Sequence, residues 1–518
     1  MTRPQTLPDW LPADVERLAR ACLMASFEGT VAPAWLVDEV ADGLGSVCLF
    51  SPNIESDDQV AELIATLRRA RRDVVIAIDE EGGDVTRLDA HTGSLTPGNA
   101  ALGALDDVGA TAAAYRMIGR RLMTLGVDLN LAPCGDVNVA AANPVIGVRA
   151  FGDDPALVAR HVAAAIDGLQ SVGVAACVKH YPGHGATVDD SHQSLPVIAD
   201  DVESLKRREF VPFAAAVAAG AAAIMTAHIV VPAVDDAPAT RSPRVLGMLR
   251  DGLGFDGVIV SDALDMAGVH GPDVAAGDVT PLHIGYAAIA SLGSGCDLLC
   301  LGARQGPEVP ATVVRAIVCA VAAGDLSLDR LESAARRCAS LRALRQPQSA
   351  ALASDDGAAV AEVARSALTV GRATPGAIRG ALIVDCRPTV SAANSDVSWG
   401  LGTDVVALDP TASTMNATDG TAPTAIVERA LDRPLVITVR GAAAHPWQQG
   451  LVEALAIARP DVVVVELGWP APDRETTLTT WGASRASTRA VAELLTGEAA
   501  RRDGSPSVSD ATSQPSSR

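Results

Sequence analysis

The stretch VAACVKHYPGHGATVDDSH, residues 174 to 192, decides the fold. Its first seven residues form an apolar run without strict alternation, which is typical of a strand buried on both faces. Pro182 and the glycines after it then exclude a helix, because proline fixes φ and glycine admits conformations closed to other residues. Lys179 and His180 stand where the run ends. The stretch therefore predicts a buried strand that leads into a polar loop.

Seven similar runs occur before residue 305. The eight runs are CLMASF (22 to 27), SVCLF (46 to 50), VVIAID (74 to 79), VDLNL (127 to 131), VAACVKH (174 to 180), AAIMTAH (222 to 228), GVIVSD (257 to 262) and DLLCL (297 to 301). Helical patterns lie between them, as in residues 157–169 before Gly173. Eight buried strands alternating with helices predict a (β/α)8 TIM barrel, although an open doubly wound sheet has the same alternation.

Ionisable residues at the ends of several runs favour the barrel. They are Asp79, Lys179 with His180, His228 and Asp262. The carboxyl ends of barrel strands form the catalytic face of that fold. We therefore expect these side chains to share one pocket.

The composition changes after the barrel region. We expect a TIM-barrel catalytic domain at 1–345, a linker with a connecting helix at 346–375, a smaller α/β sandwich domain at 376–500 and a disordered tail at 501–518. Strand candidates in the second domain are ALIVD (381 to 385), DVVALD (404 to 409), PLVITV (434 to 439) and DVVVVEL (461 to 467).

Composition narrows the class of partner. A net charge of −21 opposes phosphate backbones and anionic membrane surfaces, so we expect no nucleic acid and no membrane as partners. No uncharged apolar run of about 18 residues occurs, and the nine cysteines lie mostly in apolar runs, which indicates buried thiols and a cytoplasmic protein. Aromatic residues are only 3%, so a small ligand in a pocket is favoured over a long polysaccharide. The oligomeric state stays open.

The histidine loop admits two chemistries. His180, His184, Asp190 and His192 are all possible metal ligands, but proline and glycine prevent the helical spacing of a zinc motif. We expect no metal and no other cofactor, with His184 bracing the loop. Asp190 and His192 stand two residues apart, so in an extended segment the carboxylate can orient the imidazole for proton exchange.

Such an acid/base group needs a nucleophile or an activated water beside it. Asp262, at the end of GVIVSD, is the best-placed carboxylate. The alternative for Asp262 is a structural residue that caps the following helix.

At this point the motifs resemble those of a known family. KHYPGHGATVDDSH, SDALDM, DEEGGDVTR and NPVIGVRAFG are similar to the bacterial β-N-acetylglucosaminidases of glycoside hydrolase family 3, over residues 15–345. The resemblance implies that Asp262 is the nucleophile, that His192 is the acid/base residue and that Asp190 is its partner. It also implies residues that bind the sugar, namely Asp79, Arg87, Arg149, Lys179 and His180, with Asp136 and His228 lining the same pocket.

The resemblance implies a retaining exo-β-N-acetylglucosaminidase that acts on small N-acetylglucosaminides derived from cell wall or chitin. Four alternatives stay open: a phosphorylase that uses phosphate as acceptor, a β-glucosidase with Glu466 as proton donor, a metal-dependent amidohydrolase, and an inactive sugar-binding protein. Three residues depart from the family pattern. Asp84 replaces a common arginine, Glu80 a glutamine and Tyr181 a phenylalanine, and Asp84 puts in question the recognition of an acidic group beyond the first sugar.

Overall fold

The computed structural model describes residues 13–187, 195–271, 274–275, 277–341, 356–371, 377–387, 400–470 and 477–498. Its larger sheet is parallel, with the order β10-β1-β2-β3-β4-β5-β6-β9. The strands are β1 (Leu23–Ala25), β2 (Ser46–Leu49), β3 (Val75–Ile78), β4 (Leu129–Asn130), β5 (Ala175–Tyr181), β6 (Ala223–Thr226), β9 (Val258–Val260) and β10 (Leu299–Cys300). A parallel bridge between Val260 and Leu298 joins the two edges. The predicted barrel is thus confirmed, with one strand in each of the eight apolar runs.

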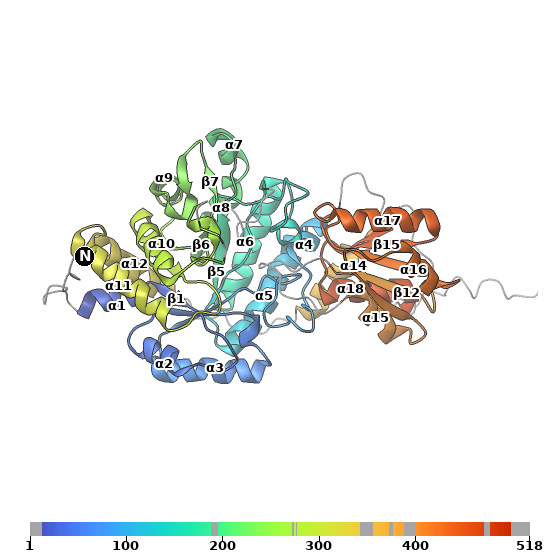
Figure 1. Ribbon diagram of the computed structural model, residues 1–518, viewed down its shortest axis with the longest axis horizontal. Helices are drawn as coiled ribbons and strands as arrows, with labels where there is room; N and C mark the ends of the chain where they lie inside the picture. Colours follow the sequence, from blue (N-terminus) through green and yellow to red (C-terminus); the bar gives the residue numbers. More distant parts are fainter. Residues whose placement is uncertain are drawn as a thin grey trace, which may run out of the picture.

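Helices surround this sheet (Figure 1). They are α1 (Ala13–Ala21), α2 (Ala34–Ala41), α3 (Asp57–Ala70), α4 (Asn99–Leu105), α5 (Val108–Leu125), α6 (Pro155–Ser171), α7 (Val202–Arg207), α8 (Phe210–Ala218), α9 (Pro243–Gly247), α10 (Pro281–Ser294), α11 (Glu308–Ala323) and α12 (Leu328–Ser340). A short hairpin of β7 (Val230–Val231) and β8 (Asp235–Pro238) follows β6. Helix α6 confirms the predicted helical pattern, and the Asp154 side chain caps it by accepting from the amide of Leu157 at 2.7 Å.

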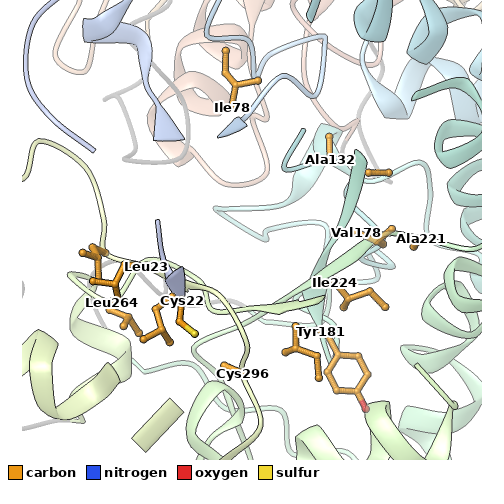
Figure 2. Packing of buried hydrophobic residues seen from close by; sticks show 14 of the residues in the cluster. Cys22, Leu23, Ile78, Ala132, Val178, Tyr181, Ala221, Ile224, Leu264 and Cys296 are labelled. Carbon is orange, nitrogen blue, oxygen red and sulfur yellow. The ribbon is translucent and has the colours of Figure 1, made fainter. Parts of the chain in front are cut away.

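The barrel strands bury both faces, in two separate clusters. Ala175 and Cys177 of β5 pack inside the barrel, whereas Val178 packs outward against the helices. Figure 2 shows Val178 next to Ile224, its partner on β6. Because side chains alternate along a strand, each inward column continues beyond the last apolar residue into the mouth of the barrel.

The second sheet has the order β11-β16-β15-β14-β12-β13. Its strands are β11 (Thr369–Val370), β12 (Leu382–Cys386), β13 (Ser413–Ala417), β14 (Leu435–Val439), β15 (Val463–Glu466) and β16 (Leu478–Thr479). The helices of this region are α14 (Gly357–Ser366), α15 (Leu401–Leu408), α16 (Pro423–Ala430), α17 (Pro446–Ala458) and α18 (Arg485–Thr496). All of these strands except the edge strand β11 run parallel to one another.

The predicted strand at 404–409 is wrong, because that run is the second half of α15. Leu401, Val405 and Leu408 face the sheet together, and their spacing of four and three is helical. A six-residue apolar run is too short to show that period by itself.

The helices of the barrel contact the segment that leads into the second domain. Arg116 and Arg120 of α5 both pair with Asp356, at 3.0 and 2.7 Å, immediately before α14.

Among the described helices, none is both long and apolar enough to cross a membrane. The tail at 501–518 and much of the linker lie outside the described residues. Eight of the cysteines are buried and Cys319 is exposed.

Candidate active site

A cavity of about 310 Å3 opens at the carboxyl ends of the barrel strands. Its size is within the range of small-molecule pockets, roughly 300–1,000 Å3. Asp79, Lys179 and Asp262 lie on its wall. Each stands two residues beyond an inward-facing core residue of its strand, namely Ala77, Cys177 and Val260. The pleat of three buried strands therefore directs these three charged groups into one mouth, as the sequence predicted.

Buried ion pairs organise one side of the pocket. The Lys179 ammonium donates to Asp79 at 2.6 Å and lies 2.7 Å from a Glu81 oxygen. The Arg149 guanidinium donates to both oxygens of Glu81, at 3.0 and 2.8 Å. Arg87 donates to the second Asp79 oxygen at 3.4 Å. Glu81 is the centre of this network, although it was not among the residues predicted from the sequence.

The ion pairs fix the charge state of the network. Burial alone would raise the pKa of Glu81, but Arg149 and Lys179 outweigh it and hold that pKa well below its usual range. Burial likewise opposes the charged form of Lys179, yet Asp79 and Glu81 raise its pKa. Glu81 and Lys179 are therefore both ionised at neutral pH. The network therefore presents fixed hydrogen-bond donors and acceptors, which are the groups needed to bind sugar hydroxyls.

Asp136 lies behind the pocket wall and is fully buried, which differs from the expectation that it lines the pocket. Its carboxylate contacts Nδ1 of His180 at 2.8 Å and accepts from the backbone amides of His180 and His184, at 3.2 and 2.7 Å. The Cys134 thiol donates to it at 3.1 Å. Asp136 thus orients His180, whose Nε2 is 3.3 Å from Arg149 on the pocket side.

Cys134, Asp136 and His180 also bring three ligand-type atoms within 4.8 Å of one another. A thiol ligand must be deprotonated, but burial, with Asp136 adding to it, raises the pKa of Cys134 well above its usual range. The hydrogen bonds already made by Asp136 account for this cluster without an ion.

His228 also lies behind the wall, although we expected it on the wall. Its Nε2 is 2.9 Å from the carbonyl oxygen of Ala263, and its Nδ1 is 2.9 Å from the Thr240 hydroxyl. His228 therefore supports the backbone next to Asp262. The Asp262 carboxylate itself lines the pocket and accepts from the Ala263 amide at 2.8 Å. No helix begins directly after Asp262, so it is not a helix cap.

The other two predicted catalytic residues, Asp190 and His192, lie outside the described residues. His184 and Thr187 are the last histidine and the last residue described before them. The two are joined by a 2.6 Å contact between Nδ1 and the hydroxyl, which agrees with a bracing role for His184.

The three residues that differ from the family pattern, Glu80, Tyr181 and Asp84, have different structural surroundings. Glu80 is buried beneath the turn after β3 and accepts from the amides of Arg87 and Leu88. Tyr181 packs in the core against two phenylalanines. Asp84 faces the second domain rather than the pocket, where it accepts from the amide of Ala483 at 2.6 Å.

Glu466, the alternative proton donor, is fully buried in the second domain. It accepts from the backbone amides of Gly441, Ala442 and Gly468, at 2.9, 3.4 and 2.6 Å. A fully buried carboxylate that is already held by three backbone donors cannot reach a substrate in the barrel pocket, so the geometry disfavours this alternative.

Comparison with known proteins bears on the family of the chain. The family model "Glycosyl hydrolase family 3 N terminal domain" matches residues 32–341. A β-hexosaminidase of Xylella fastidiosa (strain 9a5c) is 38% identical over 285 residues, which are 54% of this chain and 82% of the relative. The structure of a family 3 β-N-acetylglucosaminidase from Paenibacillus sp. str. FPU-7 matches with a TM-score of 0.82 and 31% identity, over 93% of this chain and 96% of that one. A β-N-acetylhexosaminidase from Beutenbergia cavernae DSM 12333 matches with a TM-score of 0.56 and 29% identity, over 64% of this chain and 98% of that one. The chain therefore belongs to glycosyl hydrolase family 3.

Proposed function

We propose that the protein is a retaining exo-β-N-acetylglucosaminidase that releases terminal N-acetylglucosamine from small fragments of cell wall or chitin. The observation that carries this proposal is the pocket in which Asp262 shares the wall with the network of Lys179, Arg149 and Glu81. The relative named β-hexosaminidase and the solved structure named β-N-acetylglucosaminidase support the same activity. The wall holds three cations and four carboxylates, which suits a neutral sugar better than a strongly charged one.

In the first step, the Asp262 carboxylate attacks the anomeric carbon of the sugar. The bond from that carbon to the leaving oxygen breaks, and His192 gives its proton to this oxygen. In the second step, water attacks the glycosyl-aspartate, His192 takes the water proton, and Asp262 leaves as a carboxylate. Two inversions give net retention. Asp190 orients the imidazole of His192 throughout.

The test compares Asp262→Asn and His192→Ala with the wild type on an aryl N-acetyl-β-glucosaminide. Loss of Asp262 is expected to abolish turnover, and loss of His192 to slow it by about 10² to 10⁴-fold on a poor leaving group. Undiminished turnover in either variant contradicts the proposal. The same assay on an aryl glucoside distinguishes a β-glucosidase.

The acceptor needs a separate measurement. A neutral imidazole does not repel phosphate as a carboxylate would, so this acid/base residue is compatible with phosphorolysis. Product analysis with and without phosphate decides it. Free N-acetylglucosamine in both buffers supports hydrolysis, whereas a sugar 1-phosphate formed only in phosphate makes the protein a phosphorylase.

A further inference from the structure

Glu209 is a buried carboxylate that the proposed mechanism does not use. It stands between α7 and α8 and has no exposed surface. One oxygen, Oε1, accepts from Arg208 Nε at 2.7 Å. The other, Oε2, has no hydrogen-bond partner among the residues that the structure describes. Buried polar atoms are nearly always satisfied, so an unsatisfied one needs a reason.

The unsatisfied oxygen is packed against Gly183, where the chain leaves β5. A Cβ atom at Gly183 would lie 2.2 Å from Oε2, so only glycine fits beneath the carboxylate. Gly183 has a φ of +132° and its amide donates to the His180 carbonyl at 2.8 Å. The next residue, His184, lies on the pocket wall with Asp262. Glu209 thus supports the backbone at the edge of the pocket.

Arg208, the ion-pair partner of Glu209, also contacts the chain just before α7. Arg208 forms an ion pair with Asp200, which precedes α7, as well as with Glu209. Nearby, the Ile198 amide donates to the Val230 carbonyl at 2.9 Å. Arg208 and Glu209 therefore join the exit at Gly183 to the return at Asp200. Asp190 and His192 belong to the sequence between these two ends.

We propose that Glu209 is a positioning residue for proton transfer, acting by fixing both ends of the segment that contains Asp190 and His192. This inference rests on the proposed function, which makes His192 the acid/base residue. Proton transfer depends steeply on placement, because a misplacement of about 1 Å can cost about 10²-fold in rate. Burial raises the pKa of Glu209 to about 7, with Asp136 and Asp200 adding to it and Arg208 opposing it.

The test uses two substrates that differ in their need for an acid. Phenyl N-acetyl-β-glucosaminide has a poor leaving group that needs a proton, whereas the 2,4-dinitrophenyl glycoside leaves without one. For Glu209→Ala we expect kcat/KM to fall about 10 to 100-fold on the phenyl substrate and less than about threefold on the dinitrophenyl substrate. Glu209→Gln keeps the volume against Gly183 and should recover part of the loss.

The matched control is Glu203→Ala, which removes an exposed carboxylate that pairs with Lys206 on α7. It should leave both substrates unchanged. If Glu209→Ala fails to fold, Asp200→Asn removes only the ion pair between Arg208 and Asp200, whose side chain is 35% exposed. It should show the same preference for the dinitrophenyl substrate, with a smaller loss of kcat/KM on the phenyl substrate.

Equal losses on both substrates, or no loss on either, would overturn the role of Glu209. His192→Ala separates this failure from a failure of the proposed function. If His192→Ala shows the selective loss and the Glu209 and Asp200 variants do not, only the positioning role is wrong. If His192→Ala itself affects both substrates equally, the assignment of the acid is wrong and the inference falls with it.

Discussion

Replacing Glu81 by glutamine is the sharpest test of the pocket network. The side chain is 2% exposed and neutralises two cations, Arg149 and Lys179, through three short contacts. Lys179 would keep Asp79 as an anionic partner, but Arg149, which is 7% exposed, would be left with neutral acceptors: the glutamine oxygen, the Val145 carbonyl at 3.1 Å and the His180 ring. Removing one partner of a buried ion pair typically costs about 3–5 kcal/mol, because the other charge stays buried.

The matched control is Asp57→Asn. Asp57 also forms a two-pronged pair with an arginine, Arg121, at 3.1 and 2.8 Å, but its side chain is 50% exposed. Exposed pairs contribute about 0–1 kcal/mol. In urea unfolding at pH 7 followed by circular dichroism, we expect Glu81→Gln to lose about 3–5 kcal/mol of the free energy of unfolding and the control to lose less than about 1 kcal/mol.

The pH dependence gives a second check on the same variant. The pKa of Glu81 is depressed in the folded protein, from an ordinary value of 4.5. Its stabilisation is therefore fully present above pH 4.5 and declines as the pH falls further. The difference between wild type and Glu81→Gln should shrink on acidification below that point. A loss at pH 7 no larger than that of the control would refute the buried-charge argument.

Three further predictions concern other parts of the chain. Burial raises the pKa of Glu80 to about 7, so between pH 4.5 and 7 the unfolded chain releases a proton that the folded protein keeps, and the wild type loses stability as the pH rises. The melting temperature of Glu80→Gln should therefore rise relative to that of the wild type over this interval. A constant difference would contradict this. Asp84→Ala removes the acceptor for Ala483 and a charge that faces Arg440, so calorimetry should show separate unfolding transitions for the two domains, and a single unshifted transition would exclude a joining role. Cys319 is the one exposed cysteine, so Ellman's reagent should titrate about one thiol in the native protein and nine after denaturation.

The barrel could be predicted from the sequence because each of its strands is recognisable by itself. Each run is short, apolar and followed by a turn, and the period of two carries Asp79, Lys179 and Asp262 into the mouth. The position of His228 could not be predicted in the same way. Its backbone ends a strand run, but its side chain is engaged by Thr240 and the Ala263 carbonyl, contacts that depend on how the following loop folds back.

Glu81 was missed because its partners are distant in sequence. It stands two residues beyond Asp79, after the strand has ended, where alternation no longer says which way a side chain points. One signal was present: the residues implied to bind the sugar include three cations, Arg87, Arg149 and Lys179, but only one carboxylate, Asp79, with Asp136 placed on the lining. Buried cations require partners, so a further carboxylate from the DEEGG motif around Asp79 could have been sought.

The turn after β3 connects the pocket to the second domain. Glu81 points into the pocket, and Asp84, three residues later, binds the second domain. Gly82 and Gly83 between them have φ values of +78° and +61°, and a Cβ at Gly83 would lie 2.4 Å from the Cα of Gly98. A turn so tightly packed transmits displacement rather than absorbing it. Asp84→Ala, which removes the contact with Ala483, should therefore displace the Glu81 network and raise KM for an aryl N-acetyl-β-glucosaminide.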